Sequence, residues 1–76
     1  MARPTIRKGS KGQDVTDCQN LLLKHGHALG KYGADGDFGS STHNAVMQFQ
    51  ASRNLSADGI VGKNTWKQLE GSSNSK

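Results

Sequence analysis

Several residue types that would constrain this chain strongly are scarce in it. Cysteine occurs once, as Cys18, so an internal disulfide is excluded. Proline also occurs once, and the aromatic residues Phe, Trp and Tyr make up only 5% of the sequence. No apolar run approaches the roughly 20 residues that a membrane-spanning helix needs. The first residues lack the apolar stretch of a signal peptide, so we expect either export by another route or a module excised from a longer protein.

The length and charge of the chain set further bounds. Its 76 residues suffice for one domain with a small core, and we expect a monomer. Positive and negative side chains are mixed, which argues against disorder. The formal net charge of +4 is a mild basic excess that would suit a polyanionic partner.

Two copies of one motif, Ala-Asp-Gly-x-x-Gly-x-x-Thr, dominate the sequence. They occupy 34–42 and 57–65, at an offset of 23 residues (58 − 35 = 23). Asp-Gly favours a tight turn, and the second glycine can serve as a helix N-cap. The threonine then falls at the third helical position, where we expect its hydroxyl to reach back to the amides of the first turn. Each copy therefore predicts a turn, a cap and a helix.

Apolar periodicity predicts three helices, over 13–25, 40–53 and 63–70. Their inward faces are Val15, Cys18, Leu22 and His25 in the first, Thr42, Ala45, Val46, Phe49 and Arg53 in the second, and Thr65, Trp66 and Leu69 in the third. The predicted fold is an all-α, small three-helix bundle over 13–70 with two repeated turn-helix units. We expect 1–12 to be a basic arm whose Ile6 packs on the core, and 71–76 to be a flexible tail.

Polar residues also fall on the predicted inward faces. Gln19 follows Cys18 in the first helix as Gln50 follows Phe49 in the second. Because buried polar groups need partners, we expect the two glutamines to satisfy backbone groups of the loops. His25 is expected to be half-buried and hydrogen-bonded, and Cys18 to be a small buried apolar residue.

No constellation of catalytic or metal-binding residues emerges. Asp35 and Asp37 resemble the start of a calcium loop, but the third ligand and the bidentate glutamate are missing. His25, His27 and His43 have no cysteine or carboxylate that completes a metal site. The single cysteine lies in a core stripe rather than at a helix N-terminus, where its thiolate would be stabilised. We expect no enzymatic activity, no catalytic residues, no metal and no cofactor.

A binding surface remains. Helix N-termini that follow glycine turns offer exposed amides, which attract carboxylates and phosphates. The aromatic residues Tyr32, Phe38 and Trp66 would supply apolar walls beside them. Shallow grooves of this kind suit short peptides or sugars better than a small metabolite.

Five short motifs stand in a fixed order between about Ile6 and Leu69. They are Gly9-Ser10-x-Gly12-x-x-Val15, Cys18-Gln19-x-x-Leu22, Asp35-Gly36-x-Phe38-Gly39-x-x-Thr42, Ala45-Val46-x-x-Phe49-Gln50 and Asp58-Gly59-Ile60-Val61-Gly62-x-x-Thr65-Trp66-x-x-Leu69. In this order and spacing they resemble the type-1 peptidoglycan-binding domain, a three-helix module attached to many bacterial and phage cell-wall hydrolases.

The resemblance implies non-catalytic binding of peptidoglycan, through its stem peptide and glycan, by a module that targets an attached hydrolase to murein. It also implies an extracellular, periplasmic or cell-wall location. In the family the ligand groove lies near the second and third helices and their leading loops. Carried over position by position, the ligand-binding residues would be Tyr32, Asp35, Phe38, Gly39, Thr42 and Trp66.

The chain departs from the family pattern at two places, and two alternative functions stay open. His25 and His27 stand where the family usually has leucine and an aromatic residue, and the loop over 30–33 is longer. One alternative is a protein-contact or pro-segment-like module that regulates an attached hydrolase. The other is nucleic-acid binding through the basic residues of 1–12, which we do not expect because a regular array of stacking aromatics is missing.

Overall fold

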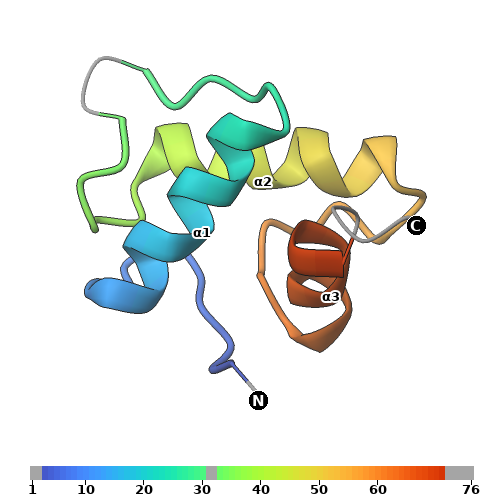
Figure 1. Ribbon diagram of the computed structural model, residues 1–76, viewed down its shortest axis with the longest axis horizontal. Coiled ribbons are helices and arrows are strands. Elements are labelled where there is room, and N and C mark those ends of the chain that lie inside the picture. Colours follow the sequence, from blue (N-terminus) through green and yellow to red (C-terminus); the bar gives the residue numbers. More distant parts are fainter. Residues whose placement is uncertain (1–2, 31–32, 72–76) are drawn as a thin grey trace.

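The computed structural model describes residues 3–30 and 33–71, and within them it contains three α-helices and no strand. They are α1 (Gln13–Lys24), α2 (Ser40–Ser52) and α3 (Lys63–Gly71). In Figure 1, α1 crosses in front of α2, and α3 lies below α2 and to the right of α1. The all-α, three-helix class predicted from the sequence is confirmed. None of the described helices is long and apolar enough to cross a bilayer.

The ends of the helices follow from local backbone chemistry. α1 ends at Lys24, one residue earlier than expected, and His25 is its C-cap. Gly26 follows at φ 88°, a left-handed conformation that favours glycine. Arg53 is the C-cap of α2. Gly71, expected to begin the tail, is the last residue of α3, and 72–76 lie outside the described residues.

One apolar core joins the helices, because α1 packs against both α2 and α3. Its members are Ile6, Val15, Cys18, Leu22, Leu29, Phe38, Ala45, Val46, Phe49, Val61, Trp66 and Leu69. The apolar residues of all three predicted inward faces are among them. Phe49 and Leu69 are 0% and 1% exposed, so the second and third helices turn the expected sides inward.

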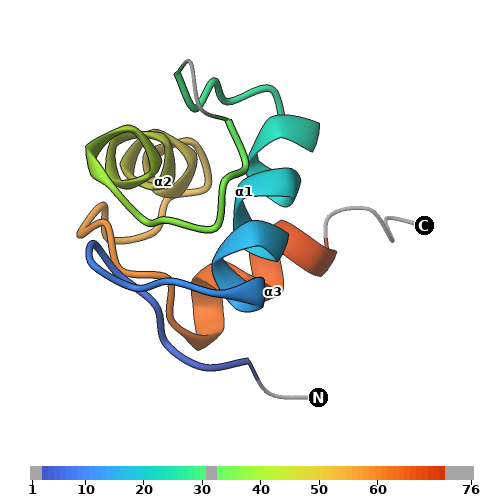
Figure 2. The same cartoon turned by 90° about the vertical axis from the view of Figure 1, so that its left-hand side faces the viewer.

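The N-terminal arm is hydrogen-bonded to both repeats at equivalent positions. Ile6 exchanges backbone hydrogen bonds with Val61, at 3.1 and 2.8 Å. The amide of Gly9 donates to the carbonyl of Phe38, and the amide of Phe38 donates to the carbonyl of Ser10, each at 2.9 Å. Since Phe38 and Val61 are 23 positions apart, the arm joins the same point of each loop. Figure 2 shows the arm passing beside the loop that leads into α3.

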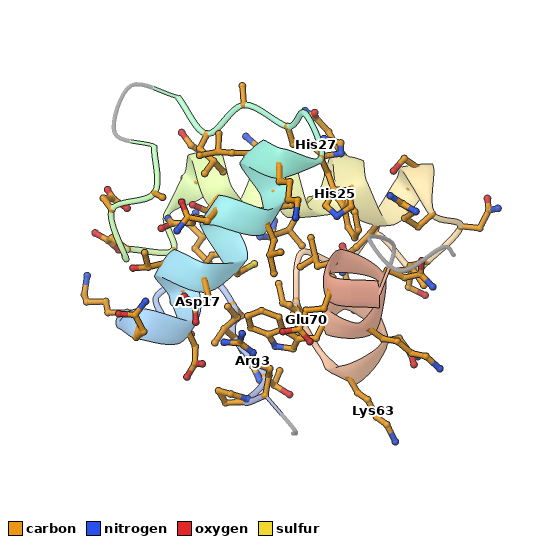
Figure 3. All side chains as sticks on the ribbon, in the orientation of Figure 1. Arg3, Asp17, His25, His27, Lys63 and Glu70 are labelled. Atoms are coloured by element: carbon orange, nitrogen blue, oxygen red, sulfur yellow. The ribbon has the colours of Figure 1, made fainter. Side chains whose placement is uncertain are left out.

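Arg3 fastens the start of the arm to α1 and α3. Its guanidinium lies 2.8 Å from Asp17, 3.1 Å from Asp14 and 3.0 Å from Glu70. The same group lies 4.8 Å from the centroid of the Trp66 ring. In Figure 3, Arg3 lies between Asp17 and Glu70. The hydrogen bond with Asp17 is the main cause that raises the pKa of Arg3, and it lowers the pKa of Asp17.

Candidate functional site

Gln19 organises the first Asp-Gly turn from inside the protein. Its side chain is 0% exposed, and its Nε2 lies 3.2 Å from Asp35 Oδ1, 3.1 Å from the Asp37 carbonyl and 2.9 Å from Thr42 Oγ1. Its Oε1 accepts a hydrogen bond of 2.8 Å from the amide of Gly36. A single buried amide therefore fixes the turn and the first turn of α2 together.

Gln50 repeats this arrangement bond for bond in the second turn. Its Nε2 lies 3.1 Å from Asp58 Oδ1, 2.9 Å from the Ile60 carbonyl and 3.1 Å from Thr65 Oγ1. Its Oε1 accepts from the amide of Gly59 at 3.0 Å. The expectation that the two glutamines satisfy backbone groups of the loops is confirmed. Each loop partner in the second turn lies 23 positions after its counterpart in the first.

The role expected for the threonines was wrong. Thr42 is 2% exposed, and its hydroxyl accepts a hydrogen bond from Gln19, while α2 has no side-chain cap at Gly39. Thr65 meets Gln50 in the same way. We expected each threonine hydroxyl to bond to amides in the first turn of its own helix. Instead, each hydroxyl accepts a hydrogen bond from the buried glutamine side chain of the preceding helix.

The turn aspartates hold their negative charge within hydrogen bonds. Asp35 Oδ1 accepts from the amide of Asp37 at 3.0 Å, and Asp58 Oδ1 accepts from the amide of Ile60 at 2.9 Å. These backbone bonds, followed by the glutamine amides, lower the pKa of both carboxyl groups. Asp35 and Asp58 therefore stay anionic at neutral pH and do not serve as proton donors.

Two surface hollows open beside the turns, one at the beginning of α2 and one at the beginning of α3. We name them the α2 hollow, of about 200 Å³, and the α3 hollow, of about 340 Å³. Seven pairs of lining residues stand 23 positions apart: Gly33 and Ser56, Asp35 and Asp58, Asp37 and Ile60, Gly39 and Gly62, Ser40 and Lys63, Ser41 and Asn64, Thr42 and Thr65. The duplication in sequence is thus a duplication of concave surface.

The two hollows differ in the chemistry of their rims. The α2 hollow carries Ser40 and Ser41 at the beginning of its helix, and the carboxylate of Asp37 beside that of Asp35. The remainder of its lining includes the apolar Leu29.

In the α3 hollow, Lys63 and Asn64 replace the two serines, and Ile60 replaces the second aspartate. Leu55 adds a further apolar wall. The larger hollow is therefore the less negative of the two.

The structure brings three of the predicted site residues together: Asp35, Gly39 and Thr42 all line the α2 hollow. Phe38 and Trp66, expected as apolar walls, are 1% and 3% exposed.

Both aromatic side chains belong to the core instead, because a chain with so few large apolar residues needs them there. The ring nitrogen of Trp66 donates to the carbonyl of Pro4 at 2.9 Å, away from the α2 hollow. Tyr32 lies outside the described residues.

The groove that the resemblance implies lies near the loops leading into both the second and the third helix, but the predicted site residues include none that line the α3 hollow. The repeat itself was the signal, because moving Asp35, Gly39 and Thr42 forward by 23 positions gives Asp58, Gly62 and Thr65, and all three line this hollow. Within residues 3–30 and 33–71, no three His, Cys, Asp or Glu side chains gather as metal ligands would.

His25 and His27 both pack near the end of α1. His25 is half-buried, with Nε2 3.0 Å from the carbonyl of Leu69 and Nδ1 3.2 Å from the guanidinium of Arg53. The rings of His25 and His27 lie 5.1 and 5.7 Å from that of Phe49. His25 is therefore hydrogen-bonded as expected, and both rings pack as aromatic residues at the end of α1. Figure 3 shows the two side by side.

Comparison with known proteins decides the family. Residues 11–69 match the family described as the peptidoglycan binding domain. The chain belongs to this family. Membership of the peptidoglycan-binding domain family accounts for the three-helix fold, which solved relatives share.

Relatives place this peptidoglycan-binding domain among cell-wall proteins. The chain is 42% identical over 64 residues to a "Probable N-acetylmuramoyl-L-alanine amidase" of Bacillus licheniformis, covering 84% of this chain and 18% of that protein. The crystal structure of the SleB N-terminal domain has a TM-score of 0.86 and 33% identity, covering 95% of this chain and 96% of that one. The Burkholderia AP3 phage endolysin has a TM-score of 0.84 and 42% identity, covering 91% and 26%. The chain thus spans less than a fifth of the length of the amidase.

Proposed function

We propose that this peptidoglycan-binding domain binds murein without catalysing a reaction, and that it holds a tethered cell-wall hydrolase on its substrate. The observation that carries the proposal is the pair of repeat-built hollows in a chain of this family. Both are open, rigidly framed by a buried glutamine, and lined by polar groups beside apolar side chains. Such surfaces suit a short peptide attached to a sugar. The place of action would be the cell wall.

The proposed contact residues are those that a ligand can reach. At the α2 hollow these are Asp35 and Gly39, and at the α3 hollow Asp58 and Gly62 take the equivalent positions. Thr42 also lines the α2 hollow, but it is 2% exposed, so it would act through its hydrogen bond with Gln19 rather than by direct contact. Phe38 and Trp66 would act indirectly, by packing beneath the loops.

Charge pairing in the arm supports murein over nucleic acid. Two of the four basic residues of the arm, Arg3, Arg7, Lys8 and Lys11, are in ion pairs: Arg3 with three carboxylates, and Lys11 with Asp37 at 3.2 Å. A phosphate backbone would have to compete with these carboxylates. We therefore expect no affinity for nucleic acid. We also expect a monomer.

Co-sedimentation with purified sacculi tests the proposed function. We expect the domain to pellet with sacculi at low salt and to remain bound at physiological ionic strength. Binding that disappears at moderate salt would mean that unspecific charge attraction alone is responsible. Failure to pellet at low salt would overturn the proposal. A gel shift with DNA and RNA at physiological salt is the matching negative control.

Replacing the glycine at the rim of each hollow with a larger residue tests which hollow contacts murein. A Cβ at Gly39 or Gly62 meets nothing within 4 Å, so Gly39→Gln and Gly62→Gln can project a side chain without a clash. Gly71→Gln, also in open space at the end of α3, is the matched control. We expect at least one of the first two variants to bind sacculi more weakly than wild type, and the control to bind like wild type. Equal binding by all three would exclude both hollows.

Activity measurements on the attached hydrolase distinguish a regulatory role of the domain from a targeting role. The full-length enzyme and the enzyme without this domain are compared on soluble muropeptides and on sacculi. Loss of activity on sacculi alone indicates targeting. Higher activity on the soluble substrate after removal would indicate that the domain covers the active site.

A further inference from the structure

The two hollows are built on the same repeated backbone motif, so the side chains that differ between them can be compared directly. At the first helical position the α2 hollow has Ser40, whereas the α3 hollow has Lys63. The α2 hollow is lined by two aspartates and by no lysine or arginine; Lys11, outside the lining, pairs with Asp37 at 3.2 Å, so Asp35 carries the uncompensated charge. In the α3 hollow, one aspartate and one lysine balance each other. The α3 hollow is therefore the one of the two that can accept an additional negative charge.

Lys63 stands at a position where helix stability alone would disfavour it. The N-terminus of a helix carries partial positive charge, so a lysine there is repelled and an acidic residue is favoured. The first turn of α3 contains no acidic residue. Over residues 3–30 and 33–71, the ion pairs involve Arg3 and Lys11, and Lys63 is in none of them. Figure 3 shows its side chain extending outward from the beginning of α3.

The remaining walls fit a peptide rather than a bare anion. Leu55 and Ile60, both partly exposed, give the α3 hollow apolar sides, and Asn64 adds an amide on the same rim as Lys63. The carboxylate of Asp58 is turned to the amide of Ile60 and to Gln50, which offsets its repulsion of a ligand anion.

We propose that Lys63 is a specificity-determining residue that binds a free carboxylate of a murein stem peptide in the α3 hollow. This rests on the proposed function and goes beyond it, because it names the chemical group that is read and the hollow that reads it. The aliphatic part of the same peptide residue lies against Leu55 and Ile60. The α2 hollow, which lacks a lysine, does not discriminate for this charge.

The test compares Lys63→Ser, which copies the α2 hollow, with Lys67→Ser, an equal loss of charge at an exposed position one turn further along α3. Affinity is measured by calorimetry with one muropeptide whose stem carboxylates are free and with the same muropeptide fully amidated. For the free form, we expect Lys63→Ser to bind about threefold to fivefold more weakly than wild type, and Lys67→Ser to bind like wild type. Lys63→Arg should retain the affinity. The wild-type preference for the free form should disappear in Lys63→Ser.

Thermal stability separates a binding role from a structural one. Because Lys63 opposes the helix dipole, Lys63→Ser should melt at the same temperature as wild type or above it, while its affinity falls. Equal affinity of Lys63→Ser and wild type for the free form would overturn this inference and leave the proposed function standing. Wild-type protein that binds neither form and does not pellet with sacculi would overturn the proposed function, and this inference with it.

Discussion

At the scale of single residues, the two buried glutamines, Gln19 and Gln50, hold the Asp-Gly turns in place through their side-chain hydrogen bonds. Their burial could be predicted, since each follows an apolar residue at the same place on a helix face. Their threonine partners could not be predicted. A threonine hydroxyl can accept a hydrogen bond from amides of its own helix or from a distant side chain, and the sequence does not show which of the two is preferred. Only the packed structure shows that Gln19 and Gln50 reach the hydroxyls of Thr42 and Thr65.

Replacing Gln50 with leucine keeps the size of the side chain and removes its hydrogen bonds. The amide of Gly59 and the carbonyl of Ile60 then lose their buried partner. We expect the free energy of unfolding in urea to fall by about 2–4 kcal/mol. Gln48→Leu, at an exposed position on the same helix, should change it by less than about 0.5 kcal/mol. Similar losses in both variants would contradict the structural role of Gln50.

The aromatic residues show where prediction of the site from sequence ends. Phe38 and Trp66 stand next to turns that look like ligand sites, so the pattern alone favoured exposure. A domain of 76 residues with one tryptophan and two phenylalanines cannot leave them at the surface and still bury a core. The predicted residues that do line the α2 hollow are the small and polar ones, Asp35, Gly39 and Thr42.

At the scale of elements, the N-terminal arm packs on the core together with the three helices. Its apolar residue, Ile6, was predicted to pack on the core, and it is 5% exposed. Its pairing with Val61, 55 positions away (61 − 6 = 55), could not be predicted, because nothing local to the arm fixes its path. Ile6 also lies before residues 11–69, the part that matches the family.

Shortening Ile6 to alanine tests the arm as a structural element. The substitution leaves a cavity between the arm and the helices, and we expect the free energy of unfolding to drop by about 2–4 kcal/mol. Thr5→Ala, at the exposed neighbouring position, is the control and should be nearly neutral. An arm that only lies on the surface would show no difference between the two variants.

The two Asp-Gly turns should make stability depend on pH in the acid range. The lowered pKa of Asp35 and of Asp58 means that the folded state prefers the charged form. Their contribution is therefore complete above the ordinary aspartate pKa of about 4, and it is lost as the pH falls through the lowered values.

We expect the melting temperature of the wild type to fall steeply below about pH 4, and the fall to be shallower in Asp35→Asn/Asp58→Asn. Asparagine keeps an acceptor oxygen for the turn but does not titrate. Asp17, whose pKa Arg3 also lowers, accounts for part of the remaining slope. Identical slopes in the two proteins would show that the turns are not coupled to pH.

At the scale of the whole molecule, α2 belongs to both repeats. It begins at the first turn, where Thr42 meets Gln19, and it carries Gln50, which organises the second turn. The arm bonds to both loops as well. The second turn therefore closes its hydrogen bonds only against the helix that the first turn begins, and the arm is bonded to both loops, so we expect the domain to unfold in a single cooperative step.

Cys18 offers a direct measurement of that cooperativity. Its thiol is 0% exposed on α1, and burial raises its pKa to about 12, so a thiol reagent at pH 8 can react only after the protein opens. If opening is global, Gln50→Leu should accelerate labelling by the factor that its loss of stability predicts, about 30-fold for 2 kcal/mol, although Gln50 lies in the second repeat network. An unchanged labelling rate in that variant would mean that α1 opens independently of the second turn. The shared helix would then not couple the two repeats.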